Sequence, residues 1–146
     1  MRRVSEHPDD LAKRSAAAMW ESDQASQALG IEIAQVASGR AVARLTVTAT
    51  MVNGHAIAHG GYVFLLADTA FAFACNAYGQ ATVARGAEIT FVAPAHEGDE
   101  LEAVAVERHR SGRNGIYDVT VRRRASGEVV AEFRGHSRQL RTRLVD

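Results

Sequence analysis

Hydrophobic and polar residues alternate along much of the chain, but one central segment is apolar almost throughout. Residues 60–78 read GGYVFLLADTAFAFACNAY, and Asp68 is the only charged residue among them. A helix that is hydrophobic on every face belongs in the interior of a protein. The segment therefore predicts a buried central helix, which Gly79 closes at a C′ position.

Strand-like alternation lies on both sides of this segment. Residues 31–38 and 41–48 flank a Gly-Arg turn and predict a hairpin. Turns containing Pro, Gly, Asp or Ser separate four further runs after the helix, which are residues 82–92, 101–108, 115–123 and 129–140. Near the start, residues 11–29 show helical spacing that ends at Gly30, and residues 1–10 are polar and expected to be loosely held.

The order of these elements predicts the architecture. Consecutive strands joined by short turns imply an antiparallel sheet, and an apolar helix must be covered on most sides. A curved sheet of about six strands wrapped around the central helix, with an added N-terminal helix, meets both demands. This α+β arrangement is the hotdog fold. One layer of sheet leaves part of the helix bare, so pairing with a second copy is expected. The 146 residues are most simply one domain, 1–146.

Composition and charge exclude several function classes. The formal net charge is zero, so no global field favours nucleic acid or an anionic membrane. The single cysteine, Cys75, excludes an internal disulfide framework and is compatible with a reducing cytoplasm. A charged N-terminus without an apolar core predicts no signal peptide, and Asp68 argues against reading the central helix as a membrane span. We expect a cytoplasmic protein without nucleic-acid or membrane partners.

Asp68 is the residue on which a functional interpretation depends. An aspartate in an apolar helix must be paired, shifted in pKa, or placed at the wall of a cleft. An apolar setting raises the pKa of such a carboxyl and improves its basicity, so Asp68 could serve as a general base or as a nucleophile. The alternative is a structural Asp with a partner, or one at a local helix break.

The loop that precedes the helix, NGHAIAHGG at residues 53–61, offers further polar groups. Gly60 and Gly61 lie where unpaired N–H groups and the positive end of the helix dipole could bind a developing oxyanion. A turn needed only for backbone conformation is the alternative, and Asn53-Gly54 is also a common hairpin dipeptide. His55 and His59 have metal-ligand spacing but lack the Glu of the H-E-x-x-H motif, so no metal site is expected.

Several ordered motifs carry a resemblance to a known family. They are ALGIEI, MVNGHAIAHGGYVFLLADTAFAFACNAYG, EITFVAPAHEGDEL, GIYDV and AEFRGHSRQL, and the resemblance covers roughly residues 20–140. The sequence resembles the PaaI-type acyl-CoA thioesterases of the hotdog superfamily, particularly phenylacetyl-CoA thioesterases of bacterial phenylacetate catabolism. The resemblance implies hydrolysis of an acyl-CoA thioester without metal or organic cofactor. It also implies a homodimer with active sites at its interface, and a homotetramer built as a dimer of dimers.

The resemblance also assigns roles residue by residue. Asp68 matches the family's catalytic acid, and Thr69 matches the hydroxyl residue beside it. Asn53 and His59 match the loop Asn and His, with a supporting role favoured for His59. Gly60 matches the residue whose N–H helps bind the thioester oxygen.

Substrate contacts are less specific. Because CoA carries phosphates, arginines could face its nucleotide, and arginine supplies sixteen of the seventeen basic side chains. The candidates are Arg110, Arg113, Arg134 and Arg138, with Gly61 and Tyr62 near the helix start. Arg85 is a further candidate and a departure, since relatives often carry a small or hydroxyl residue there. Tyr62 or Phe64 could line an acyl pocket.

The sequence therefore predicts a thioesterase acting on phenylacetyl-CoA or a ring-hydroxylated relative in phenylacetate catabolism. A thioesterase for short or medium aliphatic chains is the main alternative, because the catalytic groups would be the same. A non-catalytic acyl-CoA binding module is a second. A hydratase is disfavoured, because its D-x4-H pattern would need His where Phe73 stands.

Overall fold

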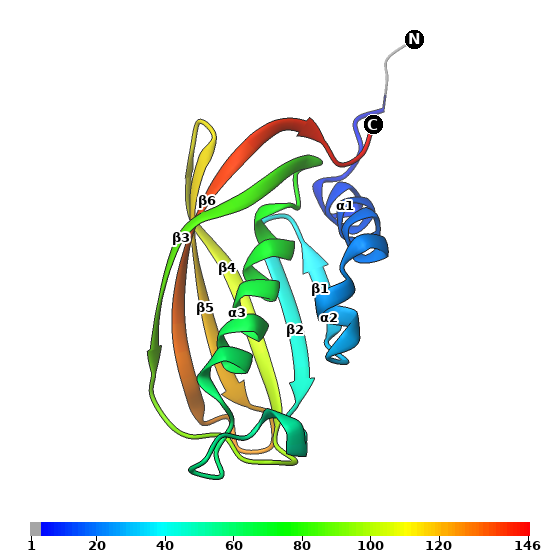
Figure 1. Ribbon diagram of the computed structural model, residues 1–146. Coiled ribbons are helices and arrows are strands. Elements are labelled where there is room, and N and C mark those ends of the chain that lie inside the picture. Colours follow the sequence, from blue (N-terminus) through cyan, green and yellow to red (C-terminus); the bar gives the residue numbers. More distant parts are fainter. Residues whose placement is uncertain (1–3) are drawn as a thin grey trace.

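The protein is described here by a computed structural model that covers residues 4–146, and its sheet curves around one central helix (Figure 1). The six strands are β1 (Glu32–Ala37), β2 (Arg40–Thr46), β3 (Gln80–Phe91), β4 (Glu100–Ser111), β5 (Asn114–Arg123) and β6 (Val129–Arg143). They are ordered β1-β2-β4-β5-β6-β3, and all neighbours are antiparallel. The predicted hotdog fold is confirmed.

Helix α3 (Gly60–Cys75) fills the concave face of the sheet and forms the centre of the core. Phe71 packs against Tyr117 and Phe133, with ring centroids 5.6 and 5.8 Å apart. This packing depends on Gly135, because a Cβ there would lie 2.7 Å from the Phe71 ring. No helix in the described part of the chain is both long and apolar enough to span a bilayer.

Helix α3 ends at Cys75, before the predicted end at residue 78, and Asn76 caps it. The Asn76 side chain donates to the carbonyl oxygens of Ala72 (2.8 Å) and Thr82 (2.9 Å) and accepts from the Thr82 N–H (2.8 Å). A buried amide that bonds both the last helical turn and the next strand fixes the direction in which the chain leaves the helix. Gly79, with φ +77°, then leads the chain into β3.

The N-terminal region differs from the single helix predicted over residues 11–29. Two helices are present, α1 (Pro8–Ser22) and α2 (Gln24–Ala28), because the Asp23 side chain accepts from the Ser26 N–H and caps a new helix. Helix α1 also begins before Leu11, with Pro8 in its first turn and a cap from His7. Residues 8–10, expected to be loosely held, are thus helical, while residues 1–3 lie outside the described part of the chain.

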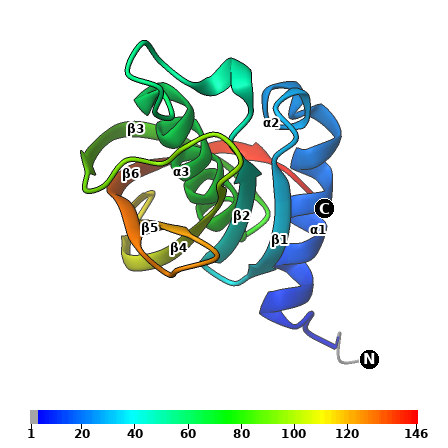
Figure 2. The same cartoon turned by 90° about the horizontal axis from the view of Figure 1, so that it is seen from below.

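One edge of the sheet is covered by a helix and the other is exposed. Helix α1 lies alongside the short edge strand β1 (Figure 2). The opposite edge is β3, twelve residues long, whose residues 83–88 are all exposed. Apolar side chains are among the exposed groups of this edge, with Val83 at 46% and Phe91 at 54% exposure. A long, unpaired and partly apolar edge is a surface suited to pairing with another strand.

Candidate active site

Between β2 and α3 the chain passes through a short 3₁₀ turn (η1, Ala49–Met51) and a loop shaped by Asn53. The Asn53 Oδ1 accepts from the N–H groups of His55 (2.9 Å) and Ile57 (3.4 Å), and Ala56 adopts φ +59°. Asn53 therefore has the conformational role that its sequence position allows. Its Nδ2 donates to no group within residues 4–146, so the amide N–H₂ remains available to a ligand.

His59 caps α3 and accepts hydrogen bonds from several of the N–H groups at the start of the helix. Its Nδ1 accepts from the Gly61 N–H at 2.9 Å, and its carbonyl oxygen accepts from Tyr62 and Val63. The N–H of Gly60 has no acceptor within residues 4–146. The Gly60 N–H, which the sequence assigns to oxyanion binding, is thus left unpaired at the positive end of the helix dipole.

An apolar pocket of about 510 Å³ opens beside this free donor. Phe91 covers Gly60 so closely that a Cβ on the glycine would lie 2.8 Å from the ring. The pocket is lined by Asn53, Ile57, Ala58, Gly60, Val63, Phe91, Val92, Ala93, Pro94, Ala95 and Val130. Apolar walls with a few convergent polar groups are typical of a small-molecule site.

Asp68 lies two turns further along α3 and is half-buried. Burial raises the pKa of its carboxyl, and no hydrogen bond or ion pair to it is found within residues 4–146. The partnered-Asp alternative is therefore not supported by the described residues. Eight residues of helix separate it from Gly60, a distance of about 12 Å at 1.5 Å per residue. The acid and the free N–H of one chain are too far apart to act on one carbonyl group.

Thr69 does not orient Asp68 in the described part of the chain. Its hydroxyl is buried and lies 3.2 Å from the Ser26 hydroxyl of α2, on another face of the helix from Asp68. Successive helical residues point about 100° apart, so a neighbour in sequence is not a neighbour on the helix surface. The contact between Thr69 and Ser26 fixes α2 against the central helix.

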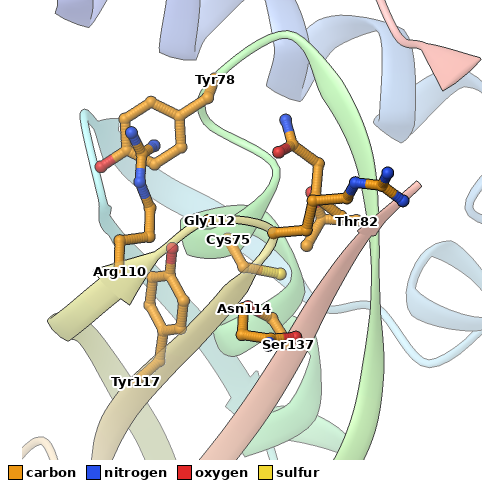
Figure 3. Close-up of a pocket in the computed structure, with 10 residues that line it drawn as sticks. Cys75, Tyr78, Thr82, Arg110, Gly112, Asn114, Tyr117 and Ser137 are labelled. Atoms are coloured by element: carbon orange, nitrogen blue, oxygen red, sulfur yellow. The ribbon is translucent and has the colours of Figure 1, made fainter. Parts of the chain in front are cut away.

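A second, more polar pocket of about 330 Å³ lies at the C-terminal end of α3 (Figure 3). Burial raises the pKa of the Cys75 thiol to about 12, and the charge of Asp68, seven residues earlier on the same face, adds to this shift. Glu107 accepts hydrogen bonds from the hydroxyls of Tyr78 (2.7 Å) and Tyr117 (3.0 Å), and burial raises the pKa of both phenols.

The arginines named from the sequence separate into different environments. Arg134 is bound by both carboxylate oxygens of Asp118, at 2.7 and 2.9 Å, and is an ion-paired surface residue. The Arg110 guanidinium stacks on the Tyr78 ring, with its Cζ 3.4 Å from the ring centroid. Arg85, Arg113 and Arg138 gather around the turn between β4 and β5.

Tyr62 lies at the N-terminal end of α3, near the apolar pocket, and is partly buried. Its ring packs edge-on against the His59 ring, and the two centroids are 6.2 Å apart. Gly61 is exposed, but its N–H is already taken by His59. Within residues 4–146, no three His, Cys, Asp or Glu side chains are grouped so that they could hold a metal ion.

Comparisons with known proteins show the family to which the chain belongs. The family model described as "Thioesterase superfamily" matches residues 55–130, which include most of the loop, helix α3 and strands β3, β4 and β5. Acyl-coenzyme A thioesterase PaaI of Escherichia coli K12 is 46% identical over 129 residues, 88% of this chain and 91% of that protein. The chain belongs to the thioesterase superfamily.

Solved structures place this thioesterase near the same relatives. The E. coli PaaI protein from the phenylacetic acid degradation operon superposes with a TM-score of 0.91 at 43% identity, covering 94% of this chain and 99% of that one. A variant of the phenylacetic acid degradation protein PaaI from Thermus thermophilus gives 0.77 at 37% identity, covering 81% and 100%. The predicted PaaI-type resemblance and the assignment as a thioester hydrolase are confirmed.

Sequence reasoning missed two residues that shape this thioesterase's pockets. Phe91, on a strand that follows the helix, covers Gly60 although it lies 31 residues later in the sequence. Asn114 accepts hydrogen bonds from both Arg85 and Arg138. Both residues lie in segments whose alternating pattern predicts a β-strand but not the contacts of its side chains. An aromatic residue at the end of a strand, just before the Pro94 turn, was the only signal for the first, and nothing in the sequence indicated the second.

Proposed function

We propose that this thioesterase hydrolyses phenylacetyl-CoA or a ring-hydroxylated relative to the free acid and CoA, as part of phenylacetate breakdown. The observation that carries the proposal is that one apolar helix presents two groups without a partner in the described chain, the Gly60 N–H and the Asp68 carboxyl. The relatives named as PaaI support the substrate class, and the apolar pocket beside Gly60 is of a size suited to an aryl-acetyl group.

In the proposed reaction the thioester oxygen accepts from the Gly60 N–H, which stabilises the charge that develops there. The Asp68 carboxylate takes a proton from water as that water attacks the carbonyl carbon. The C–S bond then breaks, and the CoA thiolate that leaves takes up the proton from Asp68. Direct attack by the carboxylate would instead displace the CoA thiolate and give a mixed anhydride, which water then hydrolyses to the free acid and the Asp68 carboxylate. The Asn53 amide orients the water or the thioester, and His59 holds the turn.

The distance of about 12 Å between Asp68 and Gly60 along the helix requires a second copy. We infer a homodimer in which the β3 edges pair and the two α3 helices lie beside each other in opposite directions. Each reaction centre then combines Asp68 of one chain with Asn53 and Gly60 of the other. Two such dimers forming a homotetramer follow from the family resemblance alone, as does the expected cytoplasmic location. We propose no cofactor, since these groups and water complete the reaction.

The test is CoA release, followed with a thiol reagent, over phenylacetyl, hydroxyphenylacetyl, benzoyl, hexanoyl and acetyl thioesters for the wild type and Asp68→Asn. An aryl-acetyl preference that disappears in the variant supports the proposal. A preference for hexanoyl or acetyl thioesters would keep the thioesterase and overturn its aryl specificity. Tight binding without turnover of any thioester would instead indicate the binding module.

A further inference from the structure

Two arginines share one neutral acceptor on the outer face of the sheet. The Oδ1 of Asn114 accepts from Nη1 of Arg85 at 3.1 Å and from Nη1 of Arg138 at 3.4 Å. Two guanidinium groups so held repel each other, and an amide oxygen carries no charge to offset them. Neither arginine has a carboxylate within ion-pair distance inside residues 4–146. Arg134, four positions before Arg138 on the same strand, differs in this respect, because it forms an ion pair with Asp118.

A bulge in β3 places Arg85 in this cluster. Ala84 pairs with Ser137 and Gly86 with His136, so Arg85 is an extra residue in the ladder. A bulge interrupts the regular alternation of side chains between the two faces of a sheet. Here the Arg85 side chain reaches Asn114 on the outer face. The bulge therefore brings a second positive charge to the acceptor that Arg138 already uses.

Arg113 brings a third positive charge from the two-residue turn between β4 and β5. It is among the residues that line the polar pocket at the C-terminal end of α3. Asn114 and Ser137, which line the same pocket, are labelled in Figure 3. The same Asn114 and Ser137 also line a hollow of about 180 Å³ that contains Arg85. The charges of Arg85, Arg113 and Arg138 therefore surround one point, the start of β5. Arg110 contributes less, because its Nε lies 3.9 Å from the Glu107 carboxylate.

The polar pocket also leads toward the proposed reaction centre. Cys75 lines the pocket and lies on the same helix face as Asp68, about 10 Å away by the rise of seven helical residues. Its other polar lining groups include Thr82 and Gln139, which suit an amide-rich chain better than an acyl group. A ligand with a polyanionic head and a polar arm would fit this rim and pocket.

We propose that Arg85, Arg113 and Arg138 form the binding site for the phosphate groups of the CoA nucleotide, with the pantetheine arm entering the polar pocket toward Asp68. The assignment rests on the proposed function, since it takes CoA as the leaving group. Arginine forks bind phosphate oxygens through paired N–H donors, and a dianionic phosphate would relieve the repulsion between the guanidinium groups. Because these side chains are exposed, binding is expected to weaken with salt.

The kinetic test compares a CoA thioester with the pantetheine thioester of the same acyl group, which lacks the nucleotide and its phosphates. Arg85→Ala, Arg113→Ala and Arg138→Ala should each raise KM for the CoA thioester about fivefold, with kcat unchanged, as expected for exposed charge pairs. KM for the pantetheine thioester should not change. Arg122→Ala is the matched control, on the same strand as Asn114 but about 27 Å along it at 3.4 Å per residue.

A binding experiment separates this site from the activity. Calorimetry with adenosine 3′,5′-bisphosphate should show binding to the wild type and to Arg122→Ala, and loss of binding to the triple arginine variant. Equal binding to the triple variant, or equal KM for CoA and pantetheine thioesters in the wild type, would overturn the phosphate site while the thioesterase proposal stands. Hydrolysis of neither thioester, with nucleotide binding intact, would overturn the thioesterase proposal alone.

Discussion

The two ends of helix α3 offer a ligand opposite environments. At the N-terminal end a free backbone N–H faces an apolar pocket walled by Phe91, Val92 and Val130. At the C-terminal end the pocket is polar, and arginines and tyrosines line it. An acyl-CoA thioester has the same asymmetry, with an apolar acyl group on one side of the reactive carbonyl and a polar, phosphorylated chain on the other.

The two ends of α3 cannot serve one substrate within one chain. Helix α3 has 16 residues and is about 24 Å long, so its two pockets lie far apart. An antiparallel pair of helices would bring the apolar end of one chain next to the acid and polar end of the other. Substitutions at the two ends should therefore have separable effects.

The largest effect is expected from Asp68→Asn, which removes the acid without changing its shape. We expect kcat to fall about 10³-fold, within the range for loss of a general base. The wild-type kcat/KM should rise with pH through a pKa above the ordinary Asp value of about 3.9, because burial raises the pKa of this carboxyl. A pH–rate profile of both proteins measures this. Retention of near-normal turnover by the variant would show that the acid is misassigned.

Gly60→Pro should lower kcat about 10²–10³-fold relative to Gly60→Ala, since it deletes an oxyanion donor. Proline is tolerated at the first position of a helix, and the preceding His59 has the extended φ −61° and ψ 131° that proline requires. Both variants add a Cβ that displaces the Phe91 ring, so their ratio isolates the N–H. Equal kcat values for the two variants would remove Gly60 from the mechanism.

Mixing the two inactive variants tests whether the ends act across chains. An Asp68→Asn chain keeps the Gly60 donor, and a Gly60→Pro chain keeps the acid, so each mixed dimer contains one intact site. Equal amounts refolded together should recover about a quarter of wild-type activity, since half of the dimers are mixed and each has one of two sites intact. Absence of recovery, with mixed dimers demonstrated by a tag on one chain, would mean that the groups act within one chain.

The smallest effect is on stability. Because the folded-state pKa of Asp68 is raised, its contribution to the free energy of unfolding is fully present below the unfolded pKa and is lost as pH rises through the folded one. Asp68→Asn should therefore be more stable than the wild type at pH 7, with a difference that shrinks toward acid pH. Urea unfolding at several pH values measures it, and a variant less stable at pH 7 would contradict the desolvation argument.

The sequence indicated the central helix, the strand order and the loop that precedes the helix, because periodicity and glycine placement are local signals. It placed Asp68 and Gly60 on that helix, yet it could not show that His59 leaves only the Gly60 N–H free. Contacts between distant segments were out of reach. Thr69 stands beside Asp68 in the sequence, but its hydroxyl contacts Ser26, 43 residues earlier. The break at Asp23 depends on a side-chain cap that competes with helical spacing.

Cys75 lines the pocket through which a thiol product would leave. An ordinary cysteine there would be open to thiol–disulfide exchange, and each oxidised CoA molecule would be a potential mixed-disulfide partner. Burial raises the pKa of Cys75 to about 12, so that almost none of it is thiolate at pH 7. Burial thus keeps the protein's own sulfur unreactive, and an enzyme that liberates a thiol at every turnover is protected from forming a mixed disulfide with the oxidised form of that product.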